Sequence, residues 1–235
     1  GLRLTALENR TTGRVWQPAL DASSFAGGEF LVQWEAVTYS ARQATELLGI
    51  DARTEADAVL LYITLRVAGA LDVTVCCRLH SGADVFEQWL EISARQPGVL
   101  SSVAPLTISA ASVPTPTLHW VRGIQNHGAG MPDSGPYPAF QVRHEALGAV
   151  MLESGLRSTW HEIAWLALDS ADDGDGLFTG LLYSGRWSAA AQAVDSGGVT
   201  LDLSTAGYAL PLAAGEQWTS PAAFVGLYHG DLDDA

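Results

Sequence analysis

Hydrophobic and polar residues alternate along much of the chain with the two-residue period of a half-buried β-strand. In residues 199–204, one face carries Val199, Leu201 and Leu203 and the other carries Thr200, Asp202 and Ser204. In residues 86–92, one face carries Phe86, Gln88, Leu90 and Ile92 and the other carries Glu87, Trp89 and Glu91. Both segments are therefore predicted to be strands with one face toward a core.

Other segments are rich in β-branched and aromatic residues and predict further strands. Residues 59–65 and 71–75 flank Ala68-Gly69-Ala70, which predicts a hairpin. More strands are expected at 149–152, 163–168, 177–183 and 222–228, a turn at 195–198, and loops at 114–117 and 128–138. Only residues 41–48 have a helical pattern, and it is too short to predict a helix. Many short strands separated by turns indicate an all-β fold, a large antiparallel sandwich, with residues 1–235 forming one domain.

Composition restricts the partners that this sandwich can have. Twelve arginines and no lysine stand against 26 acidic residues, so the net charge is −14, and no basic patch is present to bind nucleic acid. No uninterrupted apolar run approaches the ~18 residues of a transmembrane span, so no membrane partner is expected. The 235 residues leave no room for both a sandwich and an α/β barrel of ~250 residues. Because the chain begins at Gly1 without an initiator Met, we expect it to be a piece of a longer protein.

The two cysteines, Cys76 and Cys77, are adjacent in a predicted strand and point to opposite faces. They are poor disulfide partners, which favours buried apolar thiols and a reducing compartment, so we expect a cytoplasmic, bacterial protein. Residues 9–11 (NRT) match a glycosylation acceptor, a tripeptide that is common by chance.

Several short motifs resemble catalytic or metal-binding signatures but lack essential residues. Residues 195–198 (DSGG) resemble a protease nucleophile region, although a hairpin turn explains them better. His161-Glu162 begins like a zinc-protease helix, but Trp165 stands where the second histidine is required. The aspartates between 169 and 175 resemble a calcium loop that lacks its closing glutamate, so an acidic hairpin is favoured. We expect neither a metal site nor a cofactor.

Three segments in the last third of the chain resemble α-galactosidases of glycoside hydrolase family 36. Residues 153–159 (ESGLRST) are similar to the family's S-x-G-x-S-S segment, and residues 180–187 (GLLYSGRW) to its GxxLxYSGNW strand and turn. Residues 212–221 (LAAGEQWTSP) are similar to its LxPGExFxTPE stretch. Residues 84–92 and 118–123 resemble the family more loosely. His161-Glu162-Ile163 and Arg186 depart from the family's pattern and indicate a divergent branch.

The resemblance implies a galactose-mutarotase-like β-supersandwich that precedes a (β/α)8 catalytic barrel. In such enzymes both catalytic aspartates lie on the barrel, so this chain is expected to have no catalytic residue and to be inactive alone. Its implied role is to pack on the barrel, shape the cleft for a galactose-containing oligosaccharide and support a homo-oligomer. The other class that the sequence leaves open is a free-standing carbohydrate-binding or interaction module.

Candidate sugar contacts follow from the pairing of an aromatic ring with a polar neighbour, since ring faces stack on pyranoses while polar groups bind hydroxyls. Two such pairs are Trp160 with His161, and Trp187 with Arg186. The long loop adds Asn126, His127 and Asp133 as a second candidate surface. Trp34 and Trp89 are predicted to be packing residues because they lie within strands.

Overall fold

The computed structural model describes residues 5–17, 29–111, 113, 115–122, 141–146, 148–154, 162–169, 174–194 and 198–230. These residues form twenty strands and one short 3-10 helix, which confirms the all-β prediction. No helix in these ranges is long and apolar enough to cross a membrane.

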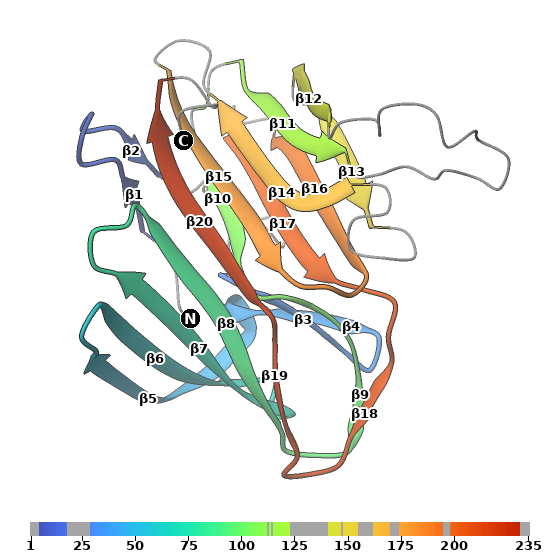
Figure 1. Cartoon of the computed structure of the whole chain (residues 1–235). Helices are drawn as coiled ribbons and strands as arrows, with labels where there is room; N and C mark the ends of the chain where they lie inside the picture. Colours follow the sequence, from blue (N-terminus) through green and yellow to red (C-terminus); the bar gives the residue numbers. More distant parts are fainter. Residues whose placement is uncertain are drawn as a thin grey trace, which may run out of the picture.

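The strands form one large sheet and several smaller ones, and every pairing of the described strands is antiparallel (Figure 1). The ten-stranded sheet has the order β12 (Gln141–Ala146), β11 (Thr117–Arg122), β14 (Glu162–Asp169), β15 (Asp175–Leu182), β20 (Ala222–His229), β8 (Val85–Ala94), β7 (Leu71–His80), β6 (Ala58–Val67) and β5 (Ala44–Thr54), and β19 (Gln217–Thr219) also pairs with β8. One four-stranded sheet contains β10 (Thr107–Ala110), β17 (Gly198–Thr205), β16 (Trp187–Val194) and β13 (Ala149–Glu153). The other contains β18 (Leu210–Leu212), β9 (Gly98–Ala104), β3 (Leu31–Trp34) and β4 (Val37–Ser40), and β1 (Leu7–Glu8) pairs with β2 (Val15–Trp16).

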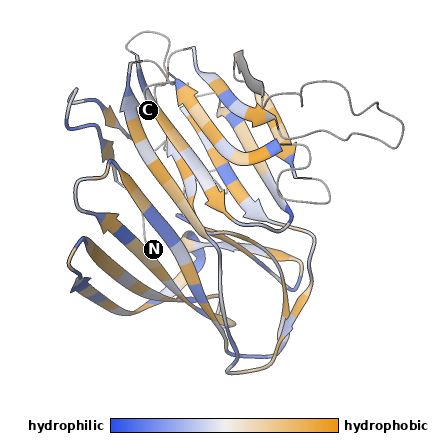
Figure 2. Ribbon diagram, in the orientation of Figure 1, coloured by the Kyte–Doolittle hydropathy of each residue, from blue (hydrophilic) through white to orange (hydrophobic). Residues whose placement is uncertain are grey.

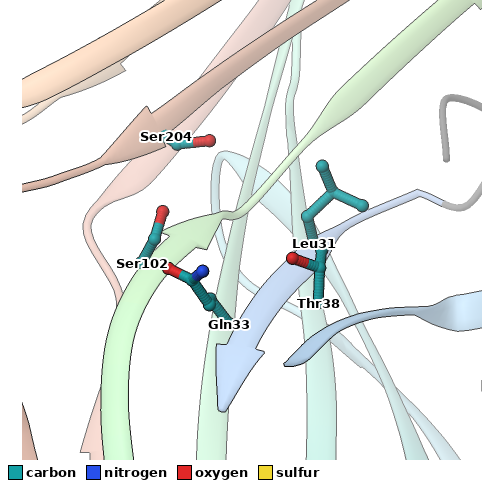
Figure 3. A pocket seen from close by; sticks show the side chains of 5 residues that line it. All are labelled: Leu31, Gln33, Thr38, Ser102 and Ser204. Atoms are coloured by element: carbon teal, nitrogen blue, oxygen red, sulfur yellow. The ribbon is translucent and has the colours of Figure 1, made fainter. Parts of the chain in front are cut away.

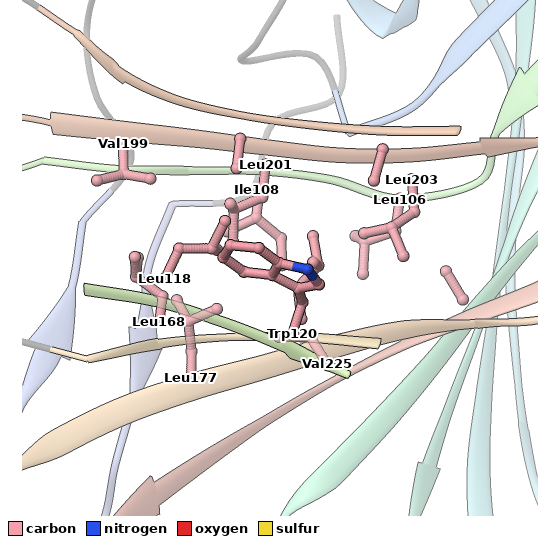
Figure 4. Packing of buried hydrophobic residues seen from close by; sticks show 14 of the residues in the cluster. Leu106, Ile108, Leu118, Trp120, Leu168, Leu177, Val199, Leu201, Leu203 and Val225 are labelled. Carbon is pink, nitrogen blue, oxygen red and sulfur yellow. The ribbon is translucent and has the colours of Figure 1, made fainter. Parts of the chain in front are cut away.

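Two hydrophobic cores fill the space between the large sheet and the two four-stranded sheets. The first core packs β11, β14, β15 and β20 against β10, β16 and β17, with Trp120 surrounded by aliphatic side chains (Figure 4). The second core packs β6, β7 and β8 against β3 and β9, and it buries Trp34 completely, as predicted. This layered arrangement confirms the antiparallel sandwich.

The strands predicted from alternation have the predicted inner faces. Leu90 and Ile92 of β8 are buried, as are the three aliphatic residues of β17, while Trp89 and Asp202 point to the opposite faces and are half-buried. The hydropathy of the ribbon alternates in the same way along these strands (Figure 2). The pairing of β16 with β17, which ends at Val194 opposite Gly198, agrees with the hairpin interpretation of the DSGG motif.

The helical pattern of residues 41–48 corresponds to a single short turn. The 3-10 helix η1 covers only Ala41–Gln43, and Ser40 and Gln43 close it with reciprocal side-chain and backbone hydrogen bonds. From Ala44 the chain continues as β5, which pairs with β6 along its whole length. Pairing with β6 therefore overrides the local helical pattern.

Candidate functional site

Only two of the predicted sugar contacts lie in the described part of the chain, Arg186 and Trp187. Trp160, His161, Asn126, His127 and Asp133 lie outside the described residues, so their predictions stay open.

Trp187 is a core residue, and its ring offers no free face to a sugar. Its side chain is 1% exposed within the first core. Ser154, which is fully buried, accepts a hydrogen bond from the Trp187 backbone N–H at 2.9 Å, and the Ser154 N–H donates to the Trp187 carbonyl. Arg186 is exposed and its guanidinium lies against Gly207, where a Cβ would come within 2.9 Å of Nε. Of this pair, Arg186 alone is accessible.

The motifs behind the family resemblance join strands rather than assemble a reactive centre. Ser154 of the first motif holds Trp187 of the second, as described above. In the third motif, the Ser220 hydroxyl accepts a 2.8 Å hydrogen bond from the N–H of Leu90, which belongs to the loosely matching segment. Glu216 in the same motif accepts from the Ala213 N–H at 2.6 Å and closes the turn before β19. These residues therefore set the position of β8 and β16.

A buried carboxylate, Asp175, anchors the N-terminal hairpin to the large sheet. It is 4% exposed and accepts hydrogen bonds from Asn9 at 3.3 Å and from the Thr12 hydroxyl at 2.9 Å. His229 Nδ1 lies 3.1 Å from the same carboxylate. The side-chain oxygen Oδ1 of Asn9 is also engaged, because it accepts a hydrogen bond from the Thr11 backbone N–H. Asn9 thus has a structural role, and its buried amide does not present the NRT tripeptide for glycosylation.

The second histidine–carboxylate pair lies on the outer face of the same sheet. His119 Nε2 is 2.7 Å from Asp169, and the Tyr228 hydroxyl donates to the other oxygen of that carboxylate. Asp169 pairs with Gly176 across the β14–β15 hairpin, as the acidic-hairpin interpretation of this region expects. Within the described ranges, no group of three or more His, Cys, Asp or Glu residues could hold a metal ion.

A cavity of about 150 Å³ lies where β17 meets the β3–β4–β9 sheet (Figure 3). Its lining consists of Leu31, Gln33, Thr38, Ser102 and Ser204. Asp202 lies two residues before Ser204, and burial raises its pKa to about 6, although a hydrogen bond with Ser204 acts in the opposite direction. The described lining residues carry hydroxyl and amide groups and no carboxylate, so among them there is no pair of acids for hydrolysis.

The two thiols of β7 are not paired. Cys76 is buried, Cys77 is half-buried, and both are free cysteines, as their adjacent positions predicted. Burial raises the pKa of Cys76 to about 12 and that of Cys77 to about 11. Neither thiol is therefore a nucleophile near neutral pH, because the thiolate is the reactive form.

Aromatic side chains on the outer face of β15 and β20 form an arrangement that the sequence reasoning missed. Phe178 lies opposite Gly226, Phe224 opposite Gly180, and Tyr228 opposite Gly176. The ring of Phe178 lies 6.3 Å from that of Phe224 and 6.3 Å from that of Tyr228, measured between centroids. The sequence signal is the complementary spacing of GLFTG in residues 176–180 and FVGLY in residues 224–228. It becomes visible only when the two strands are aligned in register.

Comparison with solved structures places this architecture among known folds. The galactosidase domain of the α-galactosidase–sucrose kinase AgaSK superposes with a TM-score of 0.69 at 16% identity, over 97% of this chain and 36% of that chain. The α-galactosidase AgaB from Geobacillus stearothermophilus gives 0.66 at 16% identity, over 92% and 32%. The fold is that of one part of GH36 α-galactosidases. The α-galactosidase from Lactobacillus brevis agrees, with a TM-score of 0.63 at 13% identity over 97% of this chain and 33% of that one.

The comparison shows the fold and the relative size. The chain spans about a third of the length of these α-galactosidases. No protein-family signature and no curated protein sequence matches this chain. The resemblance drawn from the motifs thus agrees with the fold, while what the whole enzymes do is not transferred by the fold alone.

Proposed function

We propose that residues 1–235 form a non-catalytic, N-terminal domain of an α-galactosidase-like glycoside hydrolase. In this proposal the domain packs on a (β/α)8 catalytic barrel, shapes the cleft that receives a galactose-containing oligosaccharide, and supports a homo-oligomer. The observation that carries it is the fold match, which covers 97% of this chain and 36% of the AgaSK galactosidase domain chain. The free thiols support a reducing, cytoplasmic location.

Three of the described carboxylates, Asp169, Asp175 and Asp72, are engaged by neighbouring side chains, which supports a non-catalytic role for them. Retaining glycosidases place two carboxyl groups about 5–5.5 Å apart, one of them a nucleophile with an accessible oxygen. Asp169 and Asp175 are each held by a histidine and a hydroxyl group. Asp72 is paired with Arg66 at 3.0 Å. These carboxylates stabilise the folded domain, and the proposal assigns glycoside hydrolysis to the (β/α)8 barrel.

An exposed aliphatic patch supports packing against a larger body. The patch consists of Leu47, Ile50, Val59 and Leu79, which are 46–64% exposed. Ile50 faces Ile63, and Val59 faces Leu79, so the patch continues the inner face of the large sheet beyond the second core. Contiguous exposed apolar surface on a protein marks an interaction site. We assign this patch to the contact with the barrel or with a second subunit.

The proposal is tested by assaying the purified chain and its parent protein with an aryl α-galactoside. We expect turnover by the parent and none by the chain alone, because the proposal places both catalytic carboxylates on the barrel. Turnover by the chain that one carboxylate substitution abolishes would refute the non-catalytic role. The coding sequence beyond Ala235 should continue into ~300–400 residues of alternating strand and helix pattern.

The patch assignment has a separate test. The separately expressed barrel should bind the chain, and Ile50→Arg should weaken that binding because it places a charge within the aliphatic patch. Arg53→Ala on the same strand is the matched control, since the Arg53 side chain is 68% exposed and points to the opposite face. Equal loss of binding in both variants contradicts the assignment.

A free-standing carbohydrate-binding module is the second candidate function. The observation that favours it is the row of aromatic rings on the outer face of β15 and β20. A parent coding sequence that ends near Ala235, together with sugar binding by the chain, would favour this module over the hydrolase domain.

A further inference from the structure

The outer face of the large sheet is unusually aromatic where β14, β15 and β20 lie side by side. The face of a sheet that points away from the core is usually polar, because it contacts water. Here Trp165, Phe178 and Phe224 occupy that face and are partly exposed, and Leu182 at its end is 57% exposed. In Figure 1 these strands form the near layer, with β16 and β17 behind them. None of the three aromatic residues belongs to either core.

Glycines hold two of these rings against the sheet. A Cβ atom at Gly226 would lie 2.3 Å from Cζ of Phe178, and one at Gly180 would lie 2.3 Å from Cζ of Phe224. The tip of each ring therefore lies over the backbone of its glycine partner, and the planes of the Phe178 and Phe224 rings are inclined to each other by 59°. Trp165 pairs with Gly180 from the other side, so it stands in the same row as Phe224.

Polar groups border the aromatic row. At one end the pair of His119 and Asp169 is 14% and 33% exposed. On β8, Glu87 stands opposite Phe224 and is 24% exposed, with Arg78 at 3.6 Å. Partly exposed aromatic rings and neighbouring hydrogen-bonding groups are the two elements that a pyranose requires, since its C–H face stacks on rings and its hydroxyls need polar partners.

We propose that this surface, defined by Trp165, Phe178 and Phe224, binds a neutral α-galactoside oligosaccharide. Aromatic rings stack on nucleobases as well as on sugars, but the net charge of −14 disfavours both a nucleic acid and an acidic glycan and leaves a neutral sugar. The choice of a galactoside rests on the proposed function, whereas the choice of a sugar rests on the geometry. The surface lies on the opposite side of the sheet from the aliphatic patch, so both can be occupied together.

The test is calorimetric titration of the chain with raffinose and stachyose. We expect weak saturable binding, reduced about fivefold or more in Phe178→Leu and Phe224→Leu, because a branched side chain keeps apolar volume but loses the stacking face. Tyr62→Leu is the matched control, because Tyr62 is an outer-face aromatic on β6 whose ring is covered by Arg53 at 5.1 Å. Binding by this variant should equal that of the wild type. Circular dichroism checks that each variant is folded.

Three results would overturn the inference. The first is no binding by the folded chain, and the second is equal binding by the phenylalanine variants and the wild type. The third is protection of this face from solvent in the intact parent protein, which would make it a protein interface. If the parent hydrolyses α-galactosides and any of these occurs, the inference fails while the proposed function stands. Equal binding of maltotriose would overturn the choice of a galactoside.

Discussion

Gly180 should not accept even a methyl group, because a side chain and a backbone atom already occupy the space. A Cβ atom there would lie 2.3 Å from Cζ of Phe224 and 2.8 Å from the carbonyl oxygen of Ala164. The ring can turn aside, but the carbonyl belongs to the neighbouring strand β14 and is fixed by the sheet. We expect Gly180→Ala to lower the free energy of unfolding by about 1–3 kcal/mol, the usual cost of overpacking. Each kcal/mol corresponds to a fall in Tm of about 2–4 °C for a chain of this size.

Urea unfolding followed by far-ultraviolet circular dichroism measures this effect. Gly49→Ala is the matched control, because a Cβ atom at Gly49 would meet nothing within 4 Å. The double variant Gly180→Ala, Phe224→Ala should lose less stability than the two single changes together, since removal of the ring relieves part of the clash. The Ala164 carbonyl remains, so full recovery is not expected. A stability of Gly180→Ala within about 0.5 kcal/mol of wild type would refute the packing argument.

Three further predictions concern side chains that are buried or half-buried. Ser154→Ala should cost about 1–3 kcal/mol in urea unfolding, because it leaves the buried Trp187 N–H without its acceptor. Asp202→Asn should raise the free energy of unfolding at pH 7.5 by about 3 kcal/mol, and have no such effect near pH 4. The pKa of the Asp202 carboxyl group is about 6 in the folded protein, whereas the ordinary pKa of aspartate is about 4. The folded protein therefore loses stability as the pH rises from about 4 to about 6. Cys76 and Cys77 should react with a thiol reagent at pH 8 only after unfolding, since the pKa of each is raised to about 11 or above.

Controls for these three experiments come from the same chain. Ser184→Ala changes an exposed serine in the motif that contains Trp187, so it should leave stability unchanged. Asp51→Asn changes a carboxylate that is 58% exposed, so its effect should not follow the pH profile of Asp202. A stabilising effect of Asp202→Asn at low pH would contradict the second prediction. Rapid labelling of both thiols in the folded chain would contradict the third.

The strands could be predicted because burial of one face of a strand makes hydrophobic residues recur at every second position. The β8 and β17 patterns gave the correct inner faces, since neighbours on each face share one environment. The helical pattern of residues 41–48 does not persist because it is local, whereas the pairing of β5 with β6 is a long-range interaction. The sugar contact expected for Trp187 also depended on a local relation along the chain. The residue's polar neighbour suggested a sugar contact, but Trp187, Ala189 and Ala191 share the face of β16 that points into the core.

The aromatic surface could not be found from single segments. GLFTG and FVGLY each look like ordinary strand sequences, and their fit depends on the register between β15 and β20. Sequence reasoning favoured tryptophans with adjacent polar residues, which is a relation along the chain. The relevant neighbours lie across strands, so the pairing had to be known first.

The place of β20 in the large sheet bears on how the protein folds during its synthesis. This strand comes last among the described strands, yet it lies between β15 and β8 in the middle of the sheet. While the ribosome is still making it, the β5–β8 and β11–β15 parts each present an unpaired strand edge to the other and to the cell. Such edges are where misassembly and aggregation begin. Release of residues 222–229 from the ribosome is therefore the event that joins the two cores under one sheet.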